Sequence, residues 1–489
     1  MDHRVVVVGA GFAGLQLVRD LSGAPCRITL IDQRNHHLFQ PLLYQVATTL
    51  LSTSEIAWPI RRVLRDRPEV TTLLARVTGV DRQKRCVLAE GTEPVPFDTL
   101  VLATGARHAY FGHDDWEADA PGLKTLEDAT TIRRRLLLAF ERAELASDPA
   151  ERDAHLTFAI IGGGPTGVEL AGIVADLAHR VLPREFRRID TRTARIMLIE
   201  AGPRLLPVFA PALSDYAAAA LQRRGVQVLT GRPVTDLSAR HVTIGHEDVP
   251  CRTVIWAAGV QASAAAAWLG ADADRAGRVM VGPDLSLPGD PQILVLGDTA
   301  HVPVAGGNPV PALAPAAKQQ GQYAARLIRA RLAGRTAPGP FRYVHGGNLA
   351  TIGRNAAVID LGRVRLTGRL AWWIWGIAHI YFLIGVRSRL AVGINWLWSF
   401  LSRQNPARLI TQRDVRRGDP GEQNPRAGVD TAGGHVMTRE TPKNPNPATD
   451  PPRQNGQGDH EGVPHSPEEF DVMNPAKAEK TPGGPQENQ

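Results

Sequence analysis

Cysteine is scarce in this chain of 489 residues, and its spacing excludes several kinds of redox site. The three cysteines, Cys26, Cys86 and Cys251, lie far apart and form no Cys-x-x-Cys pair and no Cys/His cluster. This pattern argues against a disulfide scaffold, a cysteine-ligated iron–sulfur centre and a dithiol that reacts in one step. It also leaves no ligand set with metal-site spacing, so we expect no bound metal.

The C-terminal segment, residues 414–489, lacks the side chains that form a hydrophobic core. It contains no Leu, Ile, Trp or Tyr, but 12 Pro and 10 Gly. Such a composition cannot bury enough apolar surface to offset the entropy lost on ordering, so we predict a disordered tail. With 8 Lys+Arg and 13 Asp+Glu the tail has a net charge of −5, which leaves +12 for residues 1–413. The composition indicates no purpose for the tail.

The basic balance of residues 1–413 raises nucleic acid as a partner, so the location of the positive charge matters more than its total. At roughly 100–200 residues per domain, the length predicts two or three domains.

Two glycine-rich motifs recur in this part of the chain in the same order. The apolar run Val5–Val8 leads into Gly9-Ala10-Gly11-Phe12-Ala13-Gly14, and Thr157–Ile161 leads into Gly162-Gly163-Gly164-Pro165-Thr166-Gly167. A second pair of similar segments, 97–105 and 251–259, ends in Gly105 and Gly259 at nearly the same offset. The repetition predicts an α/β fold with two Rossmann-like dinucleotide-binding domains. One domain would be split, as residues 1–120 and 284–355, around a second at 155–283.

Glycine at each motif position has its own physical reason. The first permits a tight turn, the second lets the backbone approach a pyrophosphate, and the third allows close contact between helix and strand. The helix N-terminus then presents free N–H groups to the phosphates. An acid at the end of the next strand can bind a ribose, and Asp32 and Glu200 have this place. The candidate cofactor residues of the two motifs are Gly9, Gly11, Phe12, Ala13, Gly14 and Asp32 in the first, and Gly162, Gly164, Gly167 and Glu200 in the second.

The spacing between glycine motif and acid is about 15 residues longer in the second unit, which predicts an extended helix of roughly 168–189. Glu200 would repel a 2′-phosphate and so favours NADH over NADPH, although Arg204 lies nearby. A strict preference between the two is not decided by the sequence. Asp298 follows a buried strand and Gly297, where it can hold a ribityl hydroxyl of a flavin. We therefore expect FAD in the split domain and NADH in the inserted one.

These motifs together resemble those of the type II (non-proton-pumping) NADH:quinone oxidoreductases, within the pyridine-nucleotide flavoprotein family. The segment Asn35–Ala47, which reads Asn-His-His-Leu-Phe-Gln-Pro-Leu-Leu-Tyr-Gln-Val-Ala, is similar to the family's segment after the FAD-ribose acid. Residues 163–172 and 200–204 are similar to its second site, and the resemblance spans about 3–412. Relatives of this fold that use thiols carry cysteines near the flavin, whereas residues 33–60 contain none.

The resemblance implies roles for individual residues. The FAD contacts would be Gly11, Ala13, Asp32, Thr48, Val77 (through its backbone, on a strand at 73–77), Gly105 and Asp298; the NADH contacts would be Gly162, Gly164, Gly167, Glu200 and Gly259. Glu169 would lie near the nicotinamide and the quinone; otherwise it only compensates a helix dipole. In 314–321 the resemblance assigns Lys318 and Gln319 to a quinone-site helix, in which Pro315 replaces the family's first glutamine. The alternative for Gln319 is a helix-surface or flavin contact.

A tryptophan-rich stretch, residues 370–401, precedes the tail. Five of the nine tryptophans lie between 372 and 398, and ten arginines but one acid lie between 361 and 417. The longest uncharged run has 17 residues, at the lower limit for crossing a bilayer, and Arg387 and Arg389 interrupt the pattern. This favours amphipathic helices within 361–413 that lie in a membrane interface. A core hairpin, a subunit interface and a single spanning helix stay open as alternatives.

The sequence therefore predicts an enzyme that passes two electrons from NADH through FAD to a membrane quinone, without pumping protons. The resemblance places it as a peripheral protein on the cytoplasmic face of the cell membrane. Anionic lipids then replace nucleic acid as the partner of the positive charge. A soluble reductase of a protein carrier such as ferredoxin or rubredoxin is the alternative, and a flavin-binding sensor a third. Which quinone is used and the oligomeric state, a homodimer included, are not decided.

Overall fold

The structure, a computed structural model, describes residues 2–304, 307–402, 407–411, 453–455 and 458–460. The chain divides into two compact units, Met1–Arg413 and Asp414–Gln489. In the second unit only β26 (Arg453–Asn455) and β27 (Gly458–His460) are described, as a two-stranded antiparallel ladder where we expected no regular structure. The rest of the predicted disordered tail lies outside the described residues.

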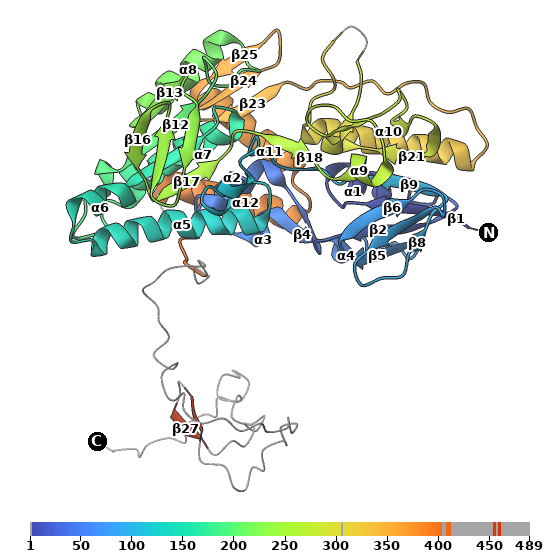
Figure 1. The fold of residues 1–489 in the computed structure, drawn as a ribbon, viewed down its shortest axis with the longest axis horizontal. Coiled ribbons are helices and arrows are strands. Elements are labelled where there is room, and N and C mark those ends of the chain that lie inside the picture. The colour runs from blue at the N-terminus through green and yellow to red at the C-terminus, as the bar shows by residue number, and fades with distance from the viewer. Residues whose placement is uncertain (1, 305–306, 403–406, 412–452, 456–457, 461–489) are drawn as a thin grey trace, which may run out of the picture. The chain divides into compact units, whose positions relative to one another are not determined.

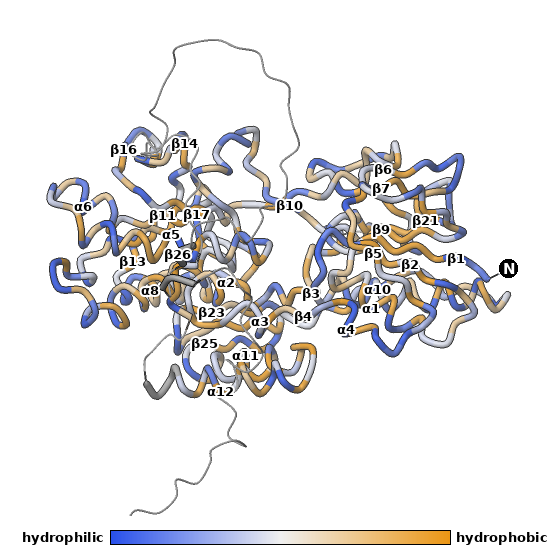
Figure 2. Tube along the Cα trace, turned by 90° about the horizontal axis from the view of Figure 1, so that it is seen from below, coloured by the Kyte–Doolittle hydropathy of each residue, from blue (hydrophilic) through white to orange (hydrophobic). Residues whose placement is uncertain are grey.

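The first sheet of the larger unit has six strands, all parallel except the edge strand β20. In spatial order they are β20 (Ser286–Leu287), β21 (Asp290–Val295), β9 (Thr99–Leu102), β1 (His3–Val8), β2 (Cys26–Asp32) and β5 (Val70–Leu74). Val5–Val8 are buried, as expected for a parallel strand covered on both faces. Figure 2 shows these central strands mostly in the orange of apolar residues. The sheet takes strands from both sides of residues 155–283 in the chain.

The second sheet has four strands, all parallel: β13 (Val226–Thr230), β12 (Arg195–Glu200), β11 (Thr157–Ile161) and β17 (Thr253–Trp256). The two sheets lie in separate lobes (Figure 1). Two parallel sheets, each with a glycine-rich turn after its central strand, confirm the predicted α/β class. Between the lobes, β10 (Ala106–His108) and β18 (Val260–Ala262) form an antiparallel ladder.

Helices cover these sheets. In the first lobe α1 (Phe12–Asp20) packs along α10 (Ala314–Leu332); in the second lie α5 (Leu126–Leu145), α6 (Pro149–His155), α7 (Pro165–Asp176) and α8 (Pro211–Gln222). The predicted helix at 168–189 is shorter than expected. After α7 a π-helical turn, Leu177–Val181, ends the helix two residues before Pro183, which has no N–H to continue it.

Shorter elements complete the larger unit. They are β3 (His36–Leu38), η1 (Gln40–Leu42), α2 (Leu43–Ala47), α3 (Thr53–Ile56), β4 (Ala57–Pro59), α4 (Ile60–Val63), β6 (Val77–Asp81), β7 (Cys86–Ala89), β8 (Val95–Pro96), η2 (Asp114–Ala118), η4 (Thr191–Thr193), β14 (Val234–Leu237), β15 (His241–Ile244), β16 (Glu247–Pro250), α9 (Ala265–Leu269), β19 (Val279–Met280), η5 (Gly297–Thr299) and β22 (Ala300–His301).

The C-terminal part of the unit is a small sheet followed by two helices. The sheet is β23 (Asn348–Thr351), β24 (Ala357–Asp360) and β25 (Arg365–Thr367), and the helices are α11 (Gly368–Phe382) and α12 (Val386–Ser402). β23 packs on α7, and α11 packs on β24. Among the described residues, no helix is long and apolar enough to cross a membrane.

The break between α11 and α12 lies at residues 383–385, not at Arg387 and Arg389 as we predicted. Leu383 has an extended backbone and Gly385 a φ of +80°, a conformation that favours glycine and ends the helix. A Cβ at Gly385 would lie 2.5 Å from the Trp58 ring, whose Nε1 donates a hydrogen bond of 2.6 Å to Ser388 Oγ. Both arginines therefore lie inside α12.

Candidate active site

The first glycine motif has three glycines in three different environments. Gly9 has a φ of +102°, and a Cβ there would lie 2.3 Å from the carbonyl oxygen of Ala103. A Cβ at Gly14 would lie 1.9 Å from the carbonyl oxygen of Gly9. A Cβ at Gly11 would meet no heavy atom within 4 Å. The first and third glycines are therefore required by the fold, whereas the space beside the second is open.

The second motif repeats this arrangement. Gly162 has a φ of +112°, and its Cβ would lie 2.5 Å from the backbone of Ala257. A Cβ at Gly167 would lie 1.8 Å from the Gly162 carbonyl oxygen, and one at Gly164 would meet nothing within 4 Å. Gly11 and Gly164 are both the N-cap residues of their helices, α1 and α7, with φ of −70° and −71°. Each open space therefore faces the positive end of a helix dipole, as a pyrophosphate site requires.

Each predicted ribose acid binds the glycine loop of its own unit. Asp32 accepts hydrogen bonds from the backbone N–H groups of Ala10, at 2.6 Å, and Arg34, at 2.7 Å. Burial raises the pKa of Asp32, opposed by the N–H of Ala10. Glu200 accepts from Gly163 N–H at 2.5 Å. Both acids thus lie at the carboxyl end of the strand beside the loop, where a nucleotide ribose is expected.

Gly105 and Gly259 occupy matching places after β9 and β17. Gly105 has a φ of +69° and open space on its Cβ side. A Cβ at Gly259 would lie 2.6 Å from the ring of Phe111, which is largely exposed. The two glycines precede β10 and β18, so both predicted nucleotide contacts lie where the chain crosses between the lobes.

Asp298 is paired with a lysine that the sequence reasoning missed. Lys124 Nζ lies 3.3 Å from Asp298 Oδ2, and both side chains are mostly buried, at 18% and 19% exposed. Gln40 Nε2 donates to the carbonyl oxygen of Lys124 at 2.9 Å. Lys124 is one of three lysines before residue 414, and this rarity was the available signal.

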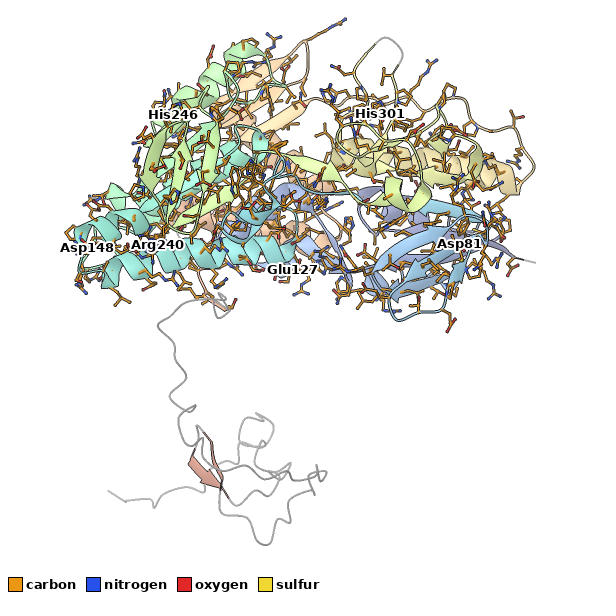
Figure 3. All side chains as sticks on the ribbon, in the orientation of Figure 1. Asp81, Glu127, Asp148, Arg240, His246 and His301 are labelled. Carbon is orange, nitrogen blue, oxygen red and sulfur yellow. The ribbon has the colours of Figure 1, made fainter. Side chains whose placement is uncertain are left out.

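The start of α5, just after Lys124, is bound to the loop after β2. Arg34 Nε lies 3.2 Å from Glu127 Oε2 in the first turn of α5. Figure 3 labels Glu127 at this border between the lobes. The segment that carries Lys124 is therefore held against the loop that follows Asp32.

The Gly297–Asp298 step and the first glycine loop converge at the start of α10. A Cβ at Gly297 would lie 3.7 Å from the Cβ atoms of both Ala13 and Ala317. A Cβ at Gly321 would lie 2.4 Å from the Ala13 carbonyl oxygen. The buried side chain of Gln320, also missed, accepts from Gly297 N–H at 2.6 Å. Residues 9–14, 297–298 and the N-terminal half of α10 thus form one surface.

Thr48 is fully buried at the end of α2, and its hydroxyl donates to the Tyr44 carbonyl oxygen at 2.7 Å. The next residue, Thr49, has a φ of +69°, which is unusual for a β-branched side chain and places local backbone strain beside a predicted FAD contact.

Val77 begins a strand of its own instead of ending one at 73–77, as we predicted. β5 ends at Leu74 and β6 starts at Val77, which pairs with Ala89. In between, Ala75 N–H still binds the Asp32 carbonyl oxygen, but Glu90 N–H binds the Arg76 carbonyl oxygen. The chain therefore leaves the parallel sheet after Ala75. Val77 itself is buried.

Phe12 starts a row of aromatic rings that reaches α11. Its ring centroid lies 6.0 Å from Phe39, which lies 6.3 Å from His379. His379 stacks on Trp375 at 4.1 Å, and Trp375 lies 5.3 Å from Trp396 on α12. Burial lowers the pKa of His379 to about 4, so this imidazole is neutral at pH 7 and packs as an aromatic ring.

Glu169, in the first part of α7, is 9% exposed. Its Oε1 accepts from the N–H of Thr351 on β23 at 3.3 Å. Burial raises the pKa of Glu169 to about 8, opposed by the Thr351 N–H. A carboxyl group with this pKa exchanges a proton near neutral pH, as general acid–base chemistry requires.

Lys318 and Gln319 have different partners although they are neighbours on α10. Lys318 Nζ lies 5.7 Å from the ring centroid of Phe382 on α11. Gln319 Nε2 donates to the Val344 carbonyl oxygen at 2.9 Å, and its Oε1 accepts from Val344 N–H at 3.0 Å. The residues on either side of Val344, Tyr343 and His345, line a cavity of about 1030 Å³ together with Leu313. Lys318 is thus held toward the C-terminal helices and Gln319 toward the segment before β23.

Most of the chain is similar in sequence to known proteins. The family described as pyridine nucleotide-disulphide oxidoreductase matches residues 3–321, and the NDH2 C-terminal domain matches residues 345–405. The type II NADH:quinone oxidoreductase Ndh of Mycobacterium tuberculosis is 42% identical over 427 residues, which cover 84% of this chain and 91% of that protein. NdhA of the same organism is 40% identical over 429 residues, with coverage of 84% and 90%.

The chain belongs to the pyridine nucleotide-disulphide oxidoreductase family, among its type II NADH:quinone oxidoreductases. A solved structure of NDH2 from Plasmodium falciparum in complex with NADH has the same fold, with a TM-score of 0.76 at 21% identity. The alignment covers 84% of this chain and all of that one. The resemblance inferred from the glycine motifs and residues 35–47 is confirmed at the level of the family.

The structure also places polar residues at the predicted sites that the sequence motifs did not identify. Lys124 and Gln320 are two of them, and the buried residues Tyr44 and Thr351 are two more. Thr351 N–H donates to Glu169, and the Tyr44 hydroxyl binds the Thr351 hydroxyl. Tyr44 lies in the stretch that carries the family resemblance, but nothing in the sequence placed it beside a residue 307 positions away.

Proposed function

We propose that this type II oxidoreductase binds FAD in the first lobe and NADH in the second, and passes two electrons to a membrane quinone without pumping protons. The observation that supports this most strongly is the pair of glycine loops with open space at Gly11 and Gly164, each at the N-terminus of a helix. The residues present therefore fit two dinucleotides. The first loop alone lies beside the buried pair of Lys124 and Asp298, which favours FAD there.

We assign the FAD-binding domain to residues 1–120 and 284–355 and the NADH-binding domain to 155–283. Residues 361–413 would associate with the membrane, and 414–489 would form the tail. The strand order of the six-stranded sheet supports this division, since β20 and β21 come from beyond the second sheet in the chain.

The FAD site would be built from the converging surfaces of the first lobe. Gly9, Gly11, Phe12, Ala13 and Gly14 would cradle the pyrophosphate, Asp32 would bind the ribose, and Thr48, Val77, Gly105 and Asp298 would complete the site. Lys124, whose Nζ lies 3.3 Å from Asp298 Oδ2, would hold the Asp298 side chain oriented toward a ribityl hydroxyl. When bound, FAD supplies the two-electron redox chemistry between NADH and quinone, and the protein supplies orientation and electrostatics.

The NADH site would be formed by Gly162, Gly164, Gly167, Glu200 and Gly259. Both Glu200 oxygens accept backbone N–H groups, from Gly163 and Gly202, which orients the carboxylate at the end of β12. A carboxylate held there can accept ribose hydroxyls and repels a 2′-phosphate, so we propose NADH as the preferred reductant.

Quinone reduction consumes protons, and Glu169 has the position and protonation to exchange one at its carboxyl group. We propose Glu169 as the acid–base residue, with Lys318 and Gln319 on α10 lining the approach of the quinone. The Lys318 ammonium over the Phe382 ring marks this approach on the side of α11.

The outer face of α11 and α12 supports a peripheral position at a membrane surface, which we assign to the cytoplasmic face of the cell membrane. The exposed apolar side chains of the two helices are Leu370, Trp373, Ile374, Ile377, Tyr381, Phe382, Val386, Leu390, Ile394, Leu397 and Trp398. The inner face packs into the core through Trp375 and Trp396. Arg369 and Arg387 are exposed at the helix starts, where anionic headgroups would bind them.

Stopped-flow spectroscopy of the flavin-loaded protein tests the reaction. NADH should bleach the flavin absorbance and an added quinone should restore it, whereas NADPH should bleach it more slowly. Bleaching that quinones fail to reverse would instead favour a reductase of a soluble protein carrier.

Vesicle flotation tests the membrane surface. The double variant Ile377→Asp/Ile394→Asp should lose binding to anionic vesicles, while Leu145→Asp, at an exposed apolar residue on α5, should keep it. Complete release of the unmodified protein by salt alone would contradict hydrophobic insertion.

A further inference from the structure

A buried chain of hydrogen bonds connects Glu169 with the C-terminal helices. Glu169 Oε1 accepts from Thr351 N–H, and Thr351 Oγ1 lies 2.9 Å from the Tyr44 hydroxyl. Gln45 Nε2 donates to the Tyr44 oxygen at 3.1 Å, and Trp396 Nε1 donates to Gln45 Oε1 at 2.7 Å. All five side chains are buried. The chain thus runs from α7 through β23 and α2 to α12.

The hydrogen bonds of this series all donate in the same direction, from Trp396 toward Thr351. An indole N–H can only donate, so Trp396 orients the Gln45 amide with its oxygen toward α12 and its NH₂ toward Tyr44. The Tyr44 oxygen is then an acceptor for Gln45, which leaves its own proton for Thr351 Oγ1. In a buried site each of these groups would be costly to leave without a partner. The orientation set at α12 is therefore transmitted to Thr351.

The position of Thr351 determines whether its backbone N–H can donate to Glu169. It is the last residue of β23, paired with Ala357, and the chain turns away at Gly353, which has a φ of +68°. Its backbone N–H is a donor to the Glu169 carboxylate, and the Tyr44 hydroxyl binds the side chain of the same residue. Tyr44 therefore fixes the strand end that presents the donor.

No nearby charge competes with this contact among the described residues. The pKa of Glu169 is raised by burial and lowered only by the Thr351 N–H. The titratable group that faces it from α2 is Tyr44, whose pKa is raised by burial and further by the Glu169 carboxylate. At the far end of α7, Asp176 pairs with Arg180 and Arg224. From β12, Glu200 binds its own loop.

We propose that Tyr44 is a positioning residue for Glu169, that it acts by holding Thr351, and that Trp396 of α12 sets the direction of the hydrogen bonds that orient it. The inference rests on the proposed role of Glu169 in quinone reduction. It adds a route by which the helices assigned to the membrane determine when Glu169 is ionised.

The pH profile of quinone reduction by the full-length, flavin-loaded protein tests this route. The limb of the pH profile that reports the titration of the Glu169 carboxyl group should be absent in Glu169→Gln. In Tyr44→Phe and in Thr351→Val the carboxylate loses support, so the limb should move to higher pH. The rate at the wild-type midpoint should then rise, by up to about twofold, because more of the Glu169 carboxyl group stays protonated at that pH. Trp396→Phe should move the limb in the same direction. Thr351→Ser keeps the hydroxyl and should retain the wild-type limb.

A matched control is Tyr323→Phe, which removes another buried hydroxyl, bonded to the Gly339 carbonyl oxygen at 2.9 Å, outside the chain. Its pH limb should stay at the wild-type position even if its melting temperature falls. The double variant Tyr44→Phe/Glu169→Gln should have the profile of Glu169→Gln alone.

Two results would overturn the inference while the proposed function stands. One is a Tyr44→Phe protein that is slower by the same factor at every pH, which would mean a merely structural role. The other is a limb that persists in Glu169→Gln, which would mean that another group titrates. A wild type that is reduced by NADH but reduces no quinone would overturn the proposed function, and the inference with it.

Discussion

Replacing the second glycine of each loop by alanine should weaken the binding of one nucleotide at a time, and so show which nucleotide each loop binds. At Gly11 and Gly164 the added methyl group meets no protein atom within 4 Å, and both residues have backbone angles that alanine adopts without strain. Folding stability should therefore stay the same or rise by about 0.4–1 kcal/mol. The methyl group instead occupies the space through which a pyrophosphate approaches, so nucleotide affinity should fall at least tenfold, or about 1.4 kcal/mol.

The third glycines provide the contrast. At Gly14 and Gly167 the added Cβ would lie 1.9 Å and 1.8 Å from a backbone carbonyl oxygen. A contact this short forces the helix away from the strand, so overpacking should destabilise the fold by about 1–3 kcal/mol or more. Gly14→Ala and Gly167→Ala should thus lower the melting temperature, which Gly11→Ala and Gly164→Ala should not.

Two measurements on each purified variant decide the assignment: flavin absorbance per protein, and KM for NADH. Gly11→Ala should lose flavin and recover activity when FAD is added in excess. Gly164→Ala should keep its flavin and show a KM for NADH at least roughly tenfold higher. The reverse pattern would refute the assignment of FAD to the first lobe. If both variants kept full flavin and an unchanged KM, the open spaces would not be nucleotide sites.

Three further outcomes follow from the buried charges and thiols. Lys124→Gln should leave Asp298 without its cation, which should lower the stability of the fold by about 1–3 kcal/mol and reduce the amount of bound flavin. Thermal melting and flavin absorbance measure the two effects, and unchanged flavin content would contradict the pairing. Because Glu169 has a pKa of about 8 when folded against its usual 4.5, the folded protein binds the extra proton and loses stability as pH rises between these values. Glu169→Gln should remove that loss in melts across this range, and an equal pH dependence in both proteins would contradict it. Replacing Cys26, Cys86 and Cys251 together by alanine should keep quinone turnover within about twofold, since all three are buried and burial raises the pKa of Cys251 to about 11; loss of flavin reduction in the folded variant would indicate a thiol step.

The strands that carry the site could be predicted because their sequence signal is local. Val5–Val8, Thr157–Ile161 and the run 195–200 are apolar stretches bounded by glycine or an acid, and each is a strand in the structure. A buried parallel strand needs such a continuous run, so the two lobes follow from composition and spacing alone.

The errors arose where tertiary contacts or single residues decide. The helix after Gly167 ends early because of Pro183, and the break before α12 depends on the φ of Gly385 packed under Trp58. Lys124, Tyr44 and Thr351 could not be found from spacing, because each meets its partner across a long stretch of chain. Such contacts come from the arrangement of the lobes, which periodicity does not encode.

The ladder between β10 and β18 makes the two crossings between the lobes one mechanical unit. Ala106, Arg107 and His108 pair in register with Ala262, Gln261 and Val260, directly after Gly105 and Gly259. One residue inserted into β10 would shift this register by about 3.3 Å and turn the following side chains to the other face. The register of the ladder thus fixes how the segments after Gly105 and Gly259 lie against each other. Evolutionary changes in length should be tolerated in outer loops such as 146–148, but not here.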